Sequence, residues 1–150
     1  MTHTLPARRA VRGFTLVELL IVVTIAGVLA SVALPSFADA LRRGRRAEAV
    51  AALMQLQLAQ ERWRADHLDY GADLRSLGLP ATTPTGLYTL AITEADAEGY
   101  VATATVAAGQ SGDRSCQVLK LTQAGGRVVY SSIDAAKVES TSGTSRCWNL

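Results

Sequence analysis

The chain has 150 residues, of which 49% are hydrophobic and 19% are charged. This composition excludes a disordered or collagen-like protein, and two cysteines are too few for a small disulfide-rich scaffold. The formal net charge of +2 arises at the N-terminal tip, where residues 1–13 carry three arginines and no acid. Residues 35–150 carry 12 basic and 12 acidic side chains, so the overall charge gives no argument for nucleic-acid binding.

The first predicted element is an apolar segment at residues 14–34, in which 16 of 21 residues are apolar. A helix of this length spans about 31 Å, close to the thickness of the hydrocarbon core of a membrane. It is longer than the apolar region of an ordinary secretory signal, which favours a transmembrane helix. The alternative is a secreted domain released by cleavage after Ala33, because Ser31-Val32-Ala33 is a small-residue cleavage pattern.

The arginines do not decide the orientation of this segment, because they occur on both sides of it. The cysteines do, since Cys116 and Cys147 lie in the distal part of the chain without metal-binding spacing. Such a pair suggests one disulfide in an oxidising compartment, the alternative being two unrelated buried thiols. We therefore expect a cytoplasmic N-terminus and a distal domain on the far side of the membrane.

Glu18 is the one charged residue within the apolar segment. It lies about 6 Å into the span, so it can be an acid tolerated near the membrane interface. It can equally be the partner of a positive charge on another chain, because ionisable groups inside a membrane are often functional. The residues alone leave both interpretations open.

The run Arg12-Gly13-Phe14-Thr-Leu-Val-Glu18-Leu-Leu-Ile resembles the N-terminus of type IV prepilins and of the related type II secretion pseudopilins. The resemblance implies that a prepilin peptidase cuts after Gly13 and that Phe14 becomes N-methylated. It also implies that Glu18 meets the terminal amine of a neighbouring subunit, which would offset the desolvation of both charges. Other pilin subunits and an inner-membrane assembly platform are the further partners it implies.

A second helical pattern follows, from residue 38 to residue 66. Pro35 precedes it, at a position where pilins often bend, and predicts a kink or a locally melted stretch. Two neighbouring apolar stripes run along this helix: Ala49, Leu53, Leu56 and Trp63 form one, and Val50, Met54 and Leu58 form the other. One stripe can pack on a sheet of the same chain; the second indicates either contact with other helices or deeper burial.

Four arginines, Arg42, Arg43, Arg45 and Arg46, form the densest run of charge. They can be a collar that attracts lipid phosphates beside the membrane, or a contact for DNA phosphates. No aromatic residue that could stack on bases is interleaved, which favours the collar and makes nucleic acid the less favoured partner. The following Ala47-Glu48 is also similar to pilins.

The distal part predicts an α+β domain. Residues 67–87 are rich in glycine and proline and indicate a loop. Alternating patterns then predict four short antiparallel strands, packed against one face of the helix. They lie at residues 87–93, 100–107, 117–122 and 127–131, the last two joined by a hairpin connection at 123–126. A Cys116–Cys147 disulfide would hold the segment 132–150, whose secondary-structure signal is weak.

Further motifs resemble the PilE class of type IV pilins, usually minor subunits; they are Gln60-Glu61-Arg62-Trp63, Tyr70, Leu77-Gly78, Pro84-Thr-Gly86-Leu-Tyr88 and Arg146-Cys147-Trp148. The resemblance implies a type IV pilin fold with a leader (1–13), a membrane and assembly segment (14–34) and a globular domain (35–150). Our leading hypothesis is a structural minor pilin that supports pilus biogenesis, adhesion or motility. The alternatives are a DNA-binding minor pilin for natural transformation and a type II secretion pseudopilin.

The sequence offers no motif for catalysis. No phosphate-binding loop, nucleophile motif or paired-acid pattern is present, so we do not expect an enzyme or a cofactor. Asp66-His67-Leu68-Asp69 is the nearest approach to a metal site, but polar residues at a helix end usually cap it, and we expect no metal. We expect the chain in the inner membrane before assembly and in an extracellular pilus afterwards.

Overall fold

The structure is a computed structural model that describes residues 13–108, 112–141 and 146–148, except for the side chains of Pro35 and Ser36. Its contacts divide the chain into two compact units, Met1–Ala38 and Asp39–Leu150. The division lies a few residues beyond the predicted end of the apolar segment.

One helix, α1 (Leu16–Asp66), contributes to both units. At Pro35 we expected either a kink or a locally melted stretch. The backbone is helical there, so a locally melted stretch is not present. The bend itself remains a prediction. Among the described residues, α1 is the one helix that is long and apolar enough to cross a membrane. All side chains from residue 16 to residue 34 are exposed within this single chain.

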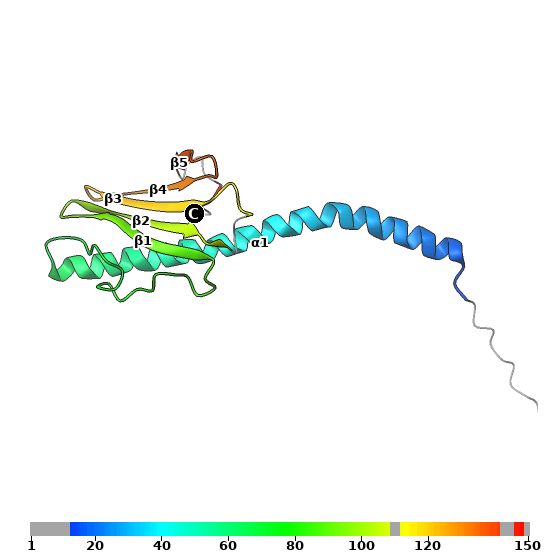
Figure 1. Cartoon of the computed structure of the whole chain (residues 1–150), viewed down its shortest axis with the longest axis horizontal. Helices are drawn as coiled ribbons and strands as arrows, with labels where there is room; N and C mark the ends of the chain where they lie inside the picture. The colour runs from blue at the N-terminus through cyan, green and yellow to red at the C-terminus, as the bar shows by residue number, and fades with distance from the viewer. Residues whose placement is uncertain (1–12, 109–111, 142–145, 149–150) are drawn as a thin grey trace, which may run out of the picture. The chain divides into compact units, whose positions relative to one another are not determined.

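The distal unit contains an antiparallel sheet of five strands (Figure 1). The strands are β1 (Tyr88–Ala95), β2 (Gly99–Val106), β3 (Val118–Ala124), β4 (Arg127–Ile133) and β5 (Glu139–Thr141), and each pairs with the next along the chain. The expected α+β class is confirmed, but the expectation of four strands is wrong by one. β5 was missed because it has three residues, too few to produce an alternating pattern, and it forms by pairing with β4.

The predicted hairpin between the third and fourth strands is confirmed. Ala124 pairs with Arg127, so Gly125 and Gly126 form a two-residue connection. Both glycines have positive φ values, 54° and 77°, which side chains with a Cβ rarely adopt. The two glycines therefore fix the register of β3 on β4.

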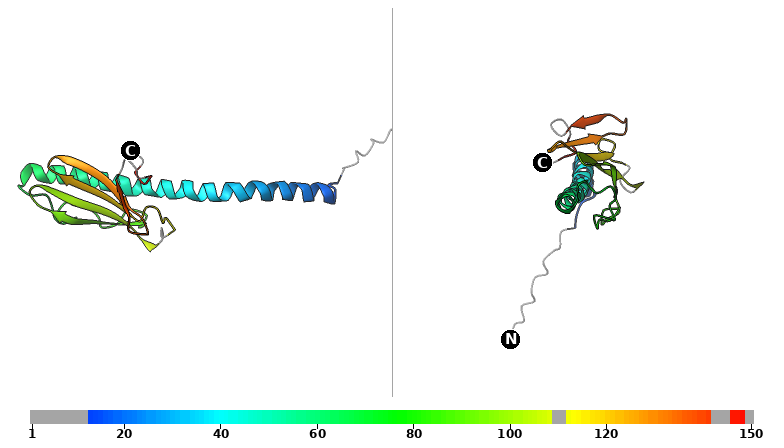
Figure 2. Two further views of the ribbon diagram at one scale, coloured as in Figure 1. Left: turned by 90° about the horizontal axis from the view of Figure 1, so that it is seen from above. Right: turned by 90° about the vertical axis from the view of Figure 1, so that its left-hand side faces the viewer.

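The core of the distal unit lies between α1 and one face of the sheet, as the end-on view shows (Figure 2). Ala49, Leu53 and Leu56 are fully buried on the helix side, which confirms most of the first predicted stripe. They face alternate strand residues, including Tyr88, Tyr100, Ala102, Leu119 and Leu121. Burial of one such large side chain contributes about 1.5–3 kcal/mol. Because every core residue in the described part of the chain belongs to 39–150, this unit has a core of its own.

The C-terminal end of the buried stripe on α1 differs from the prediction. Gln60, not Trp63, is fully buried there. Its amide donates to the carbonyl oxygen of Gly71 at 2.7 Å and accepts from the Gly71 N–H at 2.8 Å. Both polar ends of the side chain are therefore satisfied, which removes the usual cost of burying an amide. In the second stripe Val50 and Met54 are half-buried, whereas Leu58 is 57% exposed.

Candidate functional site

The first predicted site is the start of α1. Thr15 directly precedes the helix, and Glu18 lies in its first turn. The Glu18 carboxylate accepts from the Thr15 N–H at 2.9 Å and from the Thr15 hydroxyl at 2.8 Å. The Glu18 N–H in turn donates to the Thr15 hydroxyl oxygen at 3.2 Å. This is a capping box, in which the threonine and the glutamate satisfy each other's groups.

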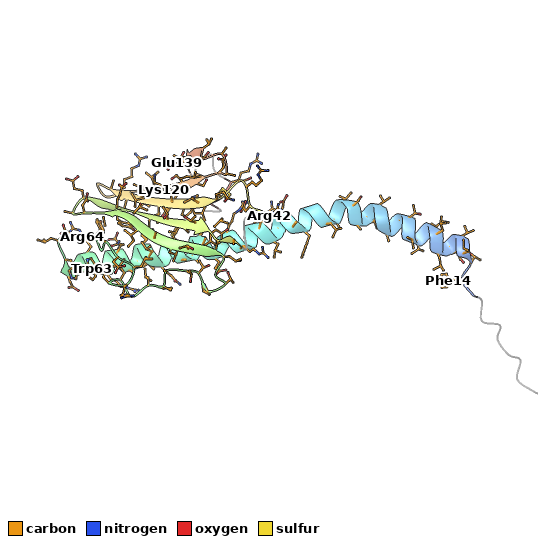
Figure 3. All side chains as sticks on the ribbon, in the orientation of Figure 1. Phe14, Arg42, Trp63, Arg64, Lys120 and Glu139 are labelled. Carbon is orange, nitrogen blue, oxygen red and sulfur yellow. A yellow bond between two sulfur atoms is a disulfide. The ribbon has the colours of Figure 1, made fainter. Side chains whose placement is uncertain are left out.

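The capping box gives Glu18 partners within its own chain. The spacing Thr-x-x-Glu is its signal in the sequence, although Thr15 was not among the predicted site residues. Phe14 is 79% exposed and Gly13 is exposed as well, next to this turn (Figure 3). The cleavage after Gly13, the methylation of Phe14 and the contact of Glu18 with another subunit remain predictions.

The four arginines of the predicted run lie in different surroundings. Arg42 is half-buried and binds Asp39, one turn earlier, at 2.8 Å. Arg43 is exposed and Arg45 is half-buried. Arg46 lies one turn after Arg42, on the helix face that continues into the buried stripe. Geometry therefore separates Arg46 from its neighbours.

Arg46 forms a two-point ion pair with Asp113, in the loop before β3. The Arg46 Nε donates to Asp113 Oδ2 at 2.6 Å, and Nη2 donates to Oδ1 at 2.8 Å. The remaining Nη1 donates to the carbonyl oxygen of Arg146 at 3.4 Å. The side chains are only 11% and 2% exposed, respectively. Such a fork holds both partners in a defined orientation, so Arg46 connects α1 to two distant segments.

The predicted disulfide joins the same two segments. Cys116 and Cys147 are bonded, with Cα atoms 5.8 Å apart, and both are buried. Trp148 follows directly; it is 5% exposed, and its indole N–H donates to the Ser131 carbonyl oxygen at 2.7 Å. The structure confirms the disulfide, and it shows Trp148 as a packing residue.

A shallow hollow of about 300 Å³ lies beside the disulfide. Its lining comes from the loop before β3, the β4–β5 region and the C-terminal segment: Arg114, Ser115, Ser132, Asp134, Val138, Ser140, Arg146 and Cys147. Arg114 and Arg146 are exposed. The one carboxylate, that of Asp134, accepts from the backbone N–H groups of Ala136 and Val138 at 2.9 Å each, so it is engaged in its own turn. The hollow thus offers two guanidinium groups and several hydroxyls.

Sequence reasoning missed Arg114 and Arg146 as site residues. Arg114 lies two residues before Cys116, and Arg146 directly precedes Cys147. Because the disulfide brings the two cysteines within 5.8 Å, it also brings their neighbours together. The expected disulfide was therefore the signal in the sequence that the segments carrying Arg114 and Arg146 lie near each other. Guanidinium groups with adjacent hydroxyls are suited to bind an anion such as a phosphate.

Charge in the distal unit is divided between its two ends. One end holds Arg42, Arg43, Arg45, Arg46, Arg114, Lys137 and Arg146, with the acids Asp39, Asp113 and Asp134. The other end holds Glu61, Asp66, Asp69, Glu94, Asp96 and Glu98, with the basic residues Arg62, Arg64 and Arg127. Figure 3 shows Arg42 at the first end of this unit and Trp63 and Arg64 at the second. Five further charged residues belong to neither group: Glu48, Asp73, Arg75, Lys120 and Glu139. A unit without net charge is therefore polarised between its two ends.

The histidine at the acidic end has structural partners. The His67 ring stacks on Trp63, with centroids 3.8 Å apart, and its Nδ1 lies 2.9 Å from the Trp63 carbonyl oxygen. Arg64 donates to the carbonyl oxygens of His67 and Ala97, which ties the helix end to the β1–β2 connection. Asp66-His67-Leu68-Asp69 thus ends the helix, and the described residues do not gather three potential metal ligands there or elsewhere.

A long helix that begins with an apolar segment and packs on an antiparallel sheet defines a pilin-like protein. Two family models match the chain. Residues 8–34 match the prokaryotic N-terminal methylation motif. Residues 35–120 match the family described as type IV minor pilin ComP, DNA uptake sequence receptor. The chain belongs to this family of type IV minor pilins, whose members are structural proteins and not enzymes.

Individual relatives agree with this assignment. The chain is 34% identical over 95 residues to the type IV major pilin protein PilE1 of Neisseria gonorrhoeae; the matched region covers 63% of this chain and 52% of that protein. It is 37% identical over 95 residues to the type IV wide pilus major component PilA4 of Thermus thermophilus, with 61% and 71% covered. It is 34% identical over 74 residues to the type II secretion system core protein G of Pectobacterium carotovorum, with 49% and 47% covered.

The chain spans about half the length of the curated relatives that it matches first. The expected resemblance to type IV pilins is nevertheless confirmed by both family models. The sequence alone favours the purely structural hypothesis. The matched family favours the alternative, a DNA-binding minor pilin. Arg42–Arg46 and Arg114 lie inside the matched segment, and Arg146 lies outside it.

Proposed function

We propose that this chain is a DNA-binding minor pilin whose basic hollow contacts the phosphate backbone of extracellular DNA. The hollow beside Cys116–Cys147 carries the proposal, because it joins Arg114 to Arg146 on an exposed surface. Guanidinium groups form two-point contacts with phosphate, and such contacts make up much of a protein–DNA interface. The description of the matched family as a DNA uptake sequence receptor supports the same function.

Charge polarity supports a one-sided approach of DNA. The distal unit has as many acidic as basic side chains, so overall charge cannot supply affinity. DNA would be attracted to the end with Arg114 and Arg146 and repelled from the end with Glu94, Asp96 and Glu98. The two hydroxyls of Ser115 and Ser140 could add contacts to phosphate oxygens. The proposed interface is therefore confined to the basic end.

Binding of a duplex across a salt series tests the proposal, using the 39–150 unit, which has a core of its own. Salt should weaken wild-type binding steeply, since each phosphate contact contributes about 0.9 to the slope of log K against log salt. Arg114→Gln and Arg146→Gln should each weaken binding and reduce that slope by about 1. Arg127→Gln is the matched control, because it removes the same charge from the acidic end. Salt-independent wild-type binding, or equal effects of Arg127→Gln and Arg146→Gln, would contradict the proposal.

The N-terminal segment would carry this interface into a filament. We propose that a prepilin peptidase cleaves after Gly13, that Phe14 is methylated, and that residues 14–34 anchor the precursor in the inner membrane. The N-terminus would face the cytoplasm and the distal unit the periplasm. Glu18 would then meet the new terminal amine of a neighbour in the pilus. The intact mass of the mature chain tests this: a methylated Phe14 is expected, and a chain starting at Leu34 would contradict it.

A pseudopilin of the type II secretion system is the second candidate, because core protein G of such a system matches nearly half of the chain. Type II secretion pseudopilins often carry calcium or lack this disulfide pattern, so the Cys116–Cys147 bond favours the pilin. We expect thermal unfolding of the 39–150 unit to be insensitive to a chelator and sensitive to a reductant. The reverse result would favour the pseudopilin.

A further inference from the structure

We infer that Arg46 and Asp113 are positioning residues for the basic hollow and that Arg46 does not itself contact DNA. This inference rests on the proposed function. Arg46 belongs to the run of four arginines in which every guanidinium was a candidate for a phosphate contact. Its side chain is only 11% exposed, however, and its fork is occupied by the Asp113 carboxylate at 2.6 and 2.8 Å. A phosphate could form a two-point contact with Nε and Nη2 only by displacing that carboxylate.

The positions of the two partners explain what the pair holds. Asp113 directly precedes Arg114, and its own carbonyl oxygen accepts from the Gln117 side chain at 2.6 Å. The third contact of Arg46, through Nη1, is to the carbonyl oxygen of Arg146 itself. One guanidinium on α1 therefore contacts the neighbour of the first hollow arginine and the backbone of the second.

The disulfide alone does not fix these two arginines. It joins Cys116 to Cys147, and Arg114 lies two residues away from Cys116. The backbone bond from Ala135 N–H to the Arg114 carbonyl oxygen, at 2.8 Å, holds one side of the loop. The ion pair of Arg46 holds the other side, against the helix. With both in place, Arg114 and Arg146 border the same hollow.

Asp113→Asn separates positioning from direct contact by the sign of its effect. The substitution removes a negative charge and frees Arg46, so general electrostatics and a direct role of Arg46 both predict tighter binding of DNA. A positioning role predicts the opposite: binding weaker by about threefold to tenfold, because two exposed phosphate contacts are misplaced. The probe is a fluorescently labelled duplex in a salt series, with the 39–150 unit.

Arg46→Lys provides the second arm. Lysine keeps the positive charge but cannot form the two-point fork. We expect Arg46→Lys to weaken binding as much as Asp113→Asn does, whereas Arg43→Lys, on the exposed surface of the same helix, should bind like the wild type. Circular dichroism and the disulfide content verify that each variant is folded. A charge swap, Arg46→Asp with Asp113→Arg, should recover part of the affinity.

The outcomes for the two proposals are distinct. Loss of binding in Arg114→Gln and Arg146→Gln, with wild-type binding by Arg46→Lys or tighter binding by Asp113→Asn, would overturn the positioning role and leave the DNA-binding function in place. Unfolding of both pair variants would assign the pair to general stability and also overturn the positioning role. A wild-type unit that does not bind DNA in a salt-dependent manner would overturn both proposals.

Discussion

Arg46 and Asp113 lie 67 residues apart in the chain and form a two-point ion pair that is almost withdrawn from solvent. The other ion pairs in the described part of the chain are more exposed. Arg42–Asp39 has side chains exposed by 40% and 62%, and Lys120–Glu139 by 28% and 45%. Because water screens an exposed pair and leaves a buried one unscreened, these pairs should differ strongly in their effect on stability.

We predict that Asp113→Ala lowers the free energy of unfolding of the 39–150 unit by about 3 kcal/mol, since it leaves the Arg46 guanidinium buried without its counter-ion. Arg42→Ala, which removes the exposed pair on the same helix, should cost less than about 0.5 kcal/mol. Urea unfolding followed by circular dichroism measures both. Similar losses for the two variants would contradict the distinction between the buried and the exposed pair.

The disulfide should contribute a comparable amount. Cys116 and Cys147 are separated by 31 positions, and closure of a loop of this size corresponds to about 3 to 4 kcal/mol of lost unfolded-state entropy. We therefore predict that the double variant Cys116→Ser/Cys147→Ser melts well below the wild type. Its melting should be unaffected by dithiothreitol, whereas wild-type melting should fall in dithiothreitol to that of the variant. A wild type that is insensitive to the reductant would show that the bond contributes little.

Local patterns were sufficient for most of the fold. Residues 38–66 have helix-forming side chains with an apolar stripe, and Ala49, Leu53 and Leu56 are buried as this pattern predicts. The four longer strands alternate, and Gly125-Gly126 identifies the turn. β5 escaped prediction because it depends on pairing with β4, a tertiary contact that its three residues do not encode locally.

The candidate site was less predictable, for a physical reason. The arginine run at 42–46 has the pattern of a single functional unit, but a helix turns each residue by about 100°, so its members face different surroundings. Arg46 faces inward and Arg43 outward. Arg114 and Arg146 become neighbours through long-range contacts, the disulfide and the ion pair of Arg46 among them, and no periodicity of the sequence reveals such contacts. The signal for them is their place beside the two cysteines, since residues that flank a disulfide must lie close together.

The capping box predicts a specific role for Thr15. We expect Thr15→Ala to leave the Glu18 carboxylate without its hydroxyl donor and to weaken the helix start by about 1 kcal/mol. Thr15→Ser keeps the hydroxyl and should retain pilus assembly, while Thr15→Ala should reduce it. Sheared filaments, quantified by immunoblot against the membrane pool, give the measurement. Glu18→Ala is the reference: it should permit processing at Gly13 and impair assembly.

Assembly of Thr15→Ala at the wild-type level, in the same experiment in which Glu18→Ala fails to assemble, would show that Glu18 acts without support from Thr15. Normal incorporation of Glu18→Ala itself would remove the assembly role that we propose for this carboxylate.

Gly99 tests how closely β2 and β3 approach each other at one end of the sheet. A Cβ at this position, the first of β2, would collide with the carbonyl oxygen and carbon of Gln123 on β3. Backbone atoms of a paired strand cannot move aside without loss of ladder hydrogen bonds, so Gly99→Ala should cost about 2–3 kcal/mol. Gly112→Ala is the control, because its nearest atom, Arg42 Nη2, would lie 3.9 Å away. Urea unfolding of both variants measures the difference; an unchanged Gly99→Ala would mean that the register at this end is adaptable.

Two carboxylates predict how stability depends on pH. The Glu48 carboxylate accepts from the N–H of Thr85 at 3.0 Å and from the Thr85 hydroxyl at 2.7 Å. The bond from the N–H is the main cause that lowers the pKa of Glu48 below the ordinary value of 4.5. The hydroxyl of Ser131, followed by Lys120, lowers the pKa of Glu139 in the same direction. A folded-state pKa below the unfolded one gives stability that is complete above the unfolded pKa and is lost as the pH falls through the folded one.

We therefore expect the wild-type 39–150 unit to lose stability progressively as the pH falls below about 4.5, the range in which these carboxylates become protonated. Glu48→Gln cannot titrate, so its urea midpoint should fall less between neutral pH and about pH 3 than the wild-type midpoint does. Glu48→Gln/Glu139→Gln should flatten the dependence further, because sites without shared partners act additively. A wild-type slope in the double variant would place the acid sensitivity on other carboxylates and show that the contacts of Glu48 to Thr85 and of Glu139 to Ser131 do not favour the ionised forms.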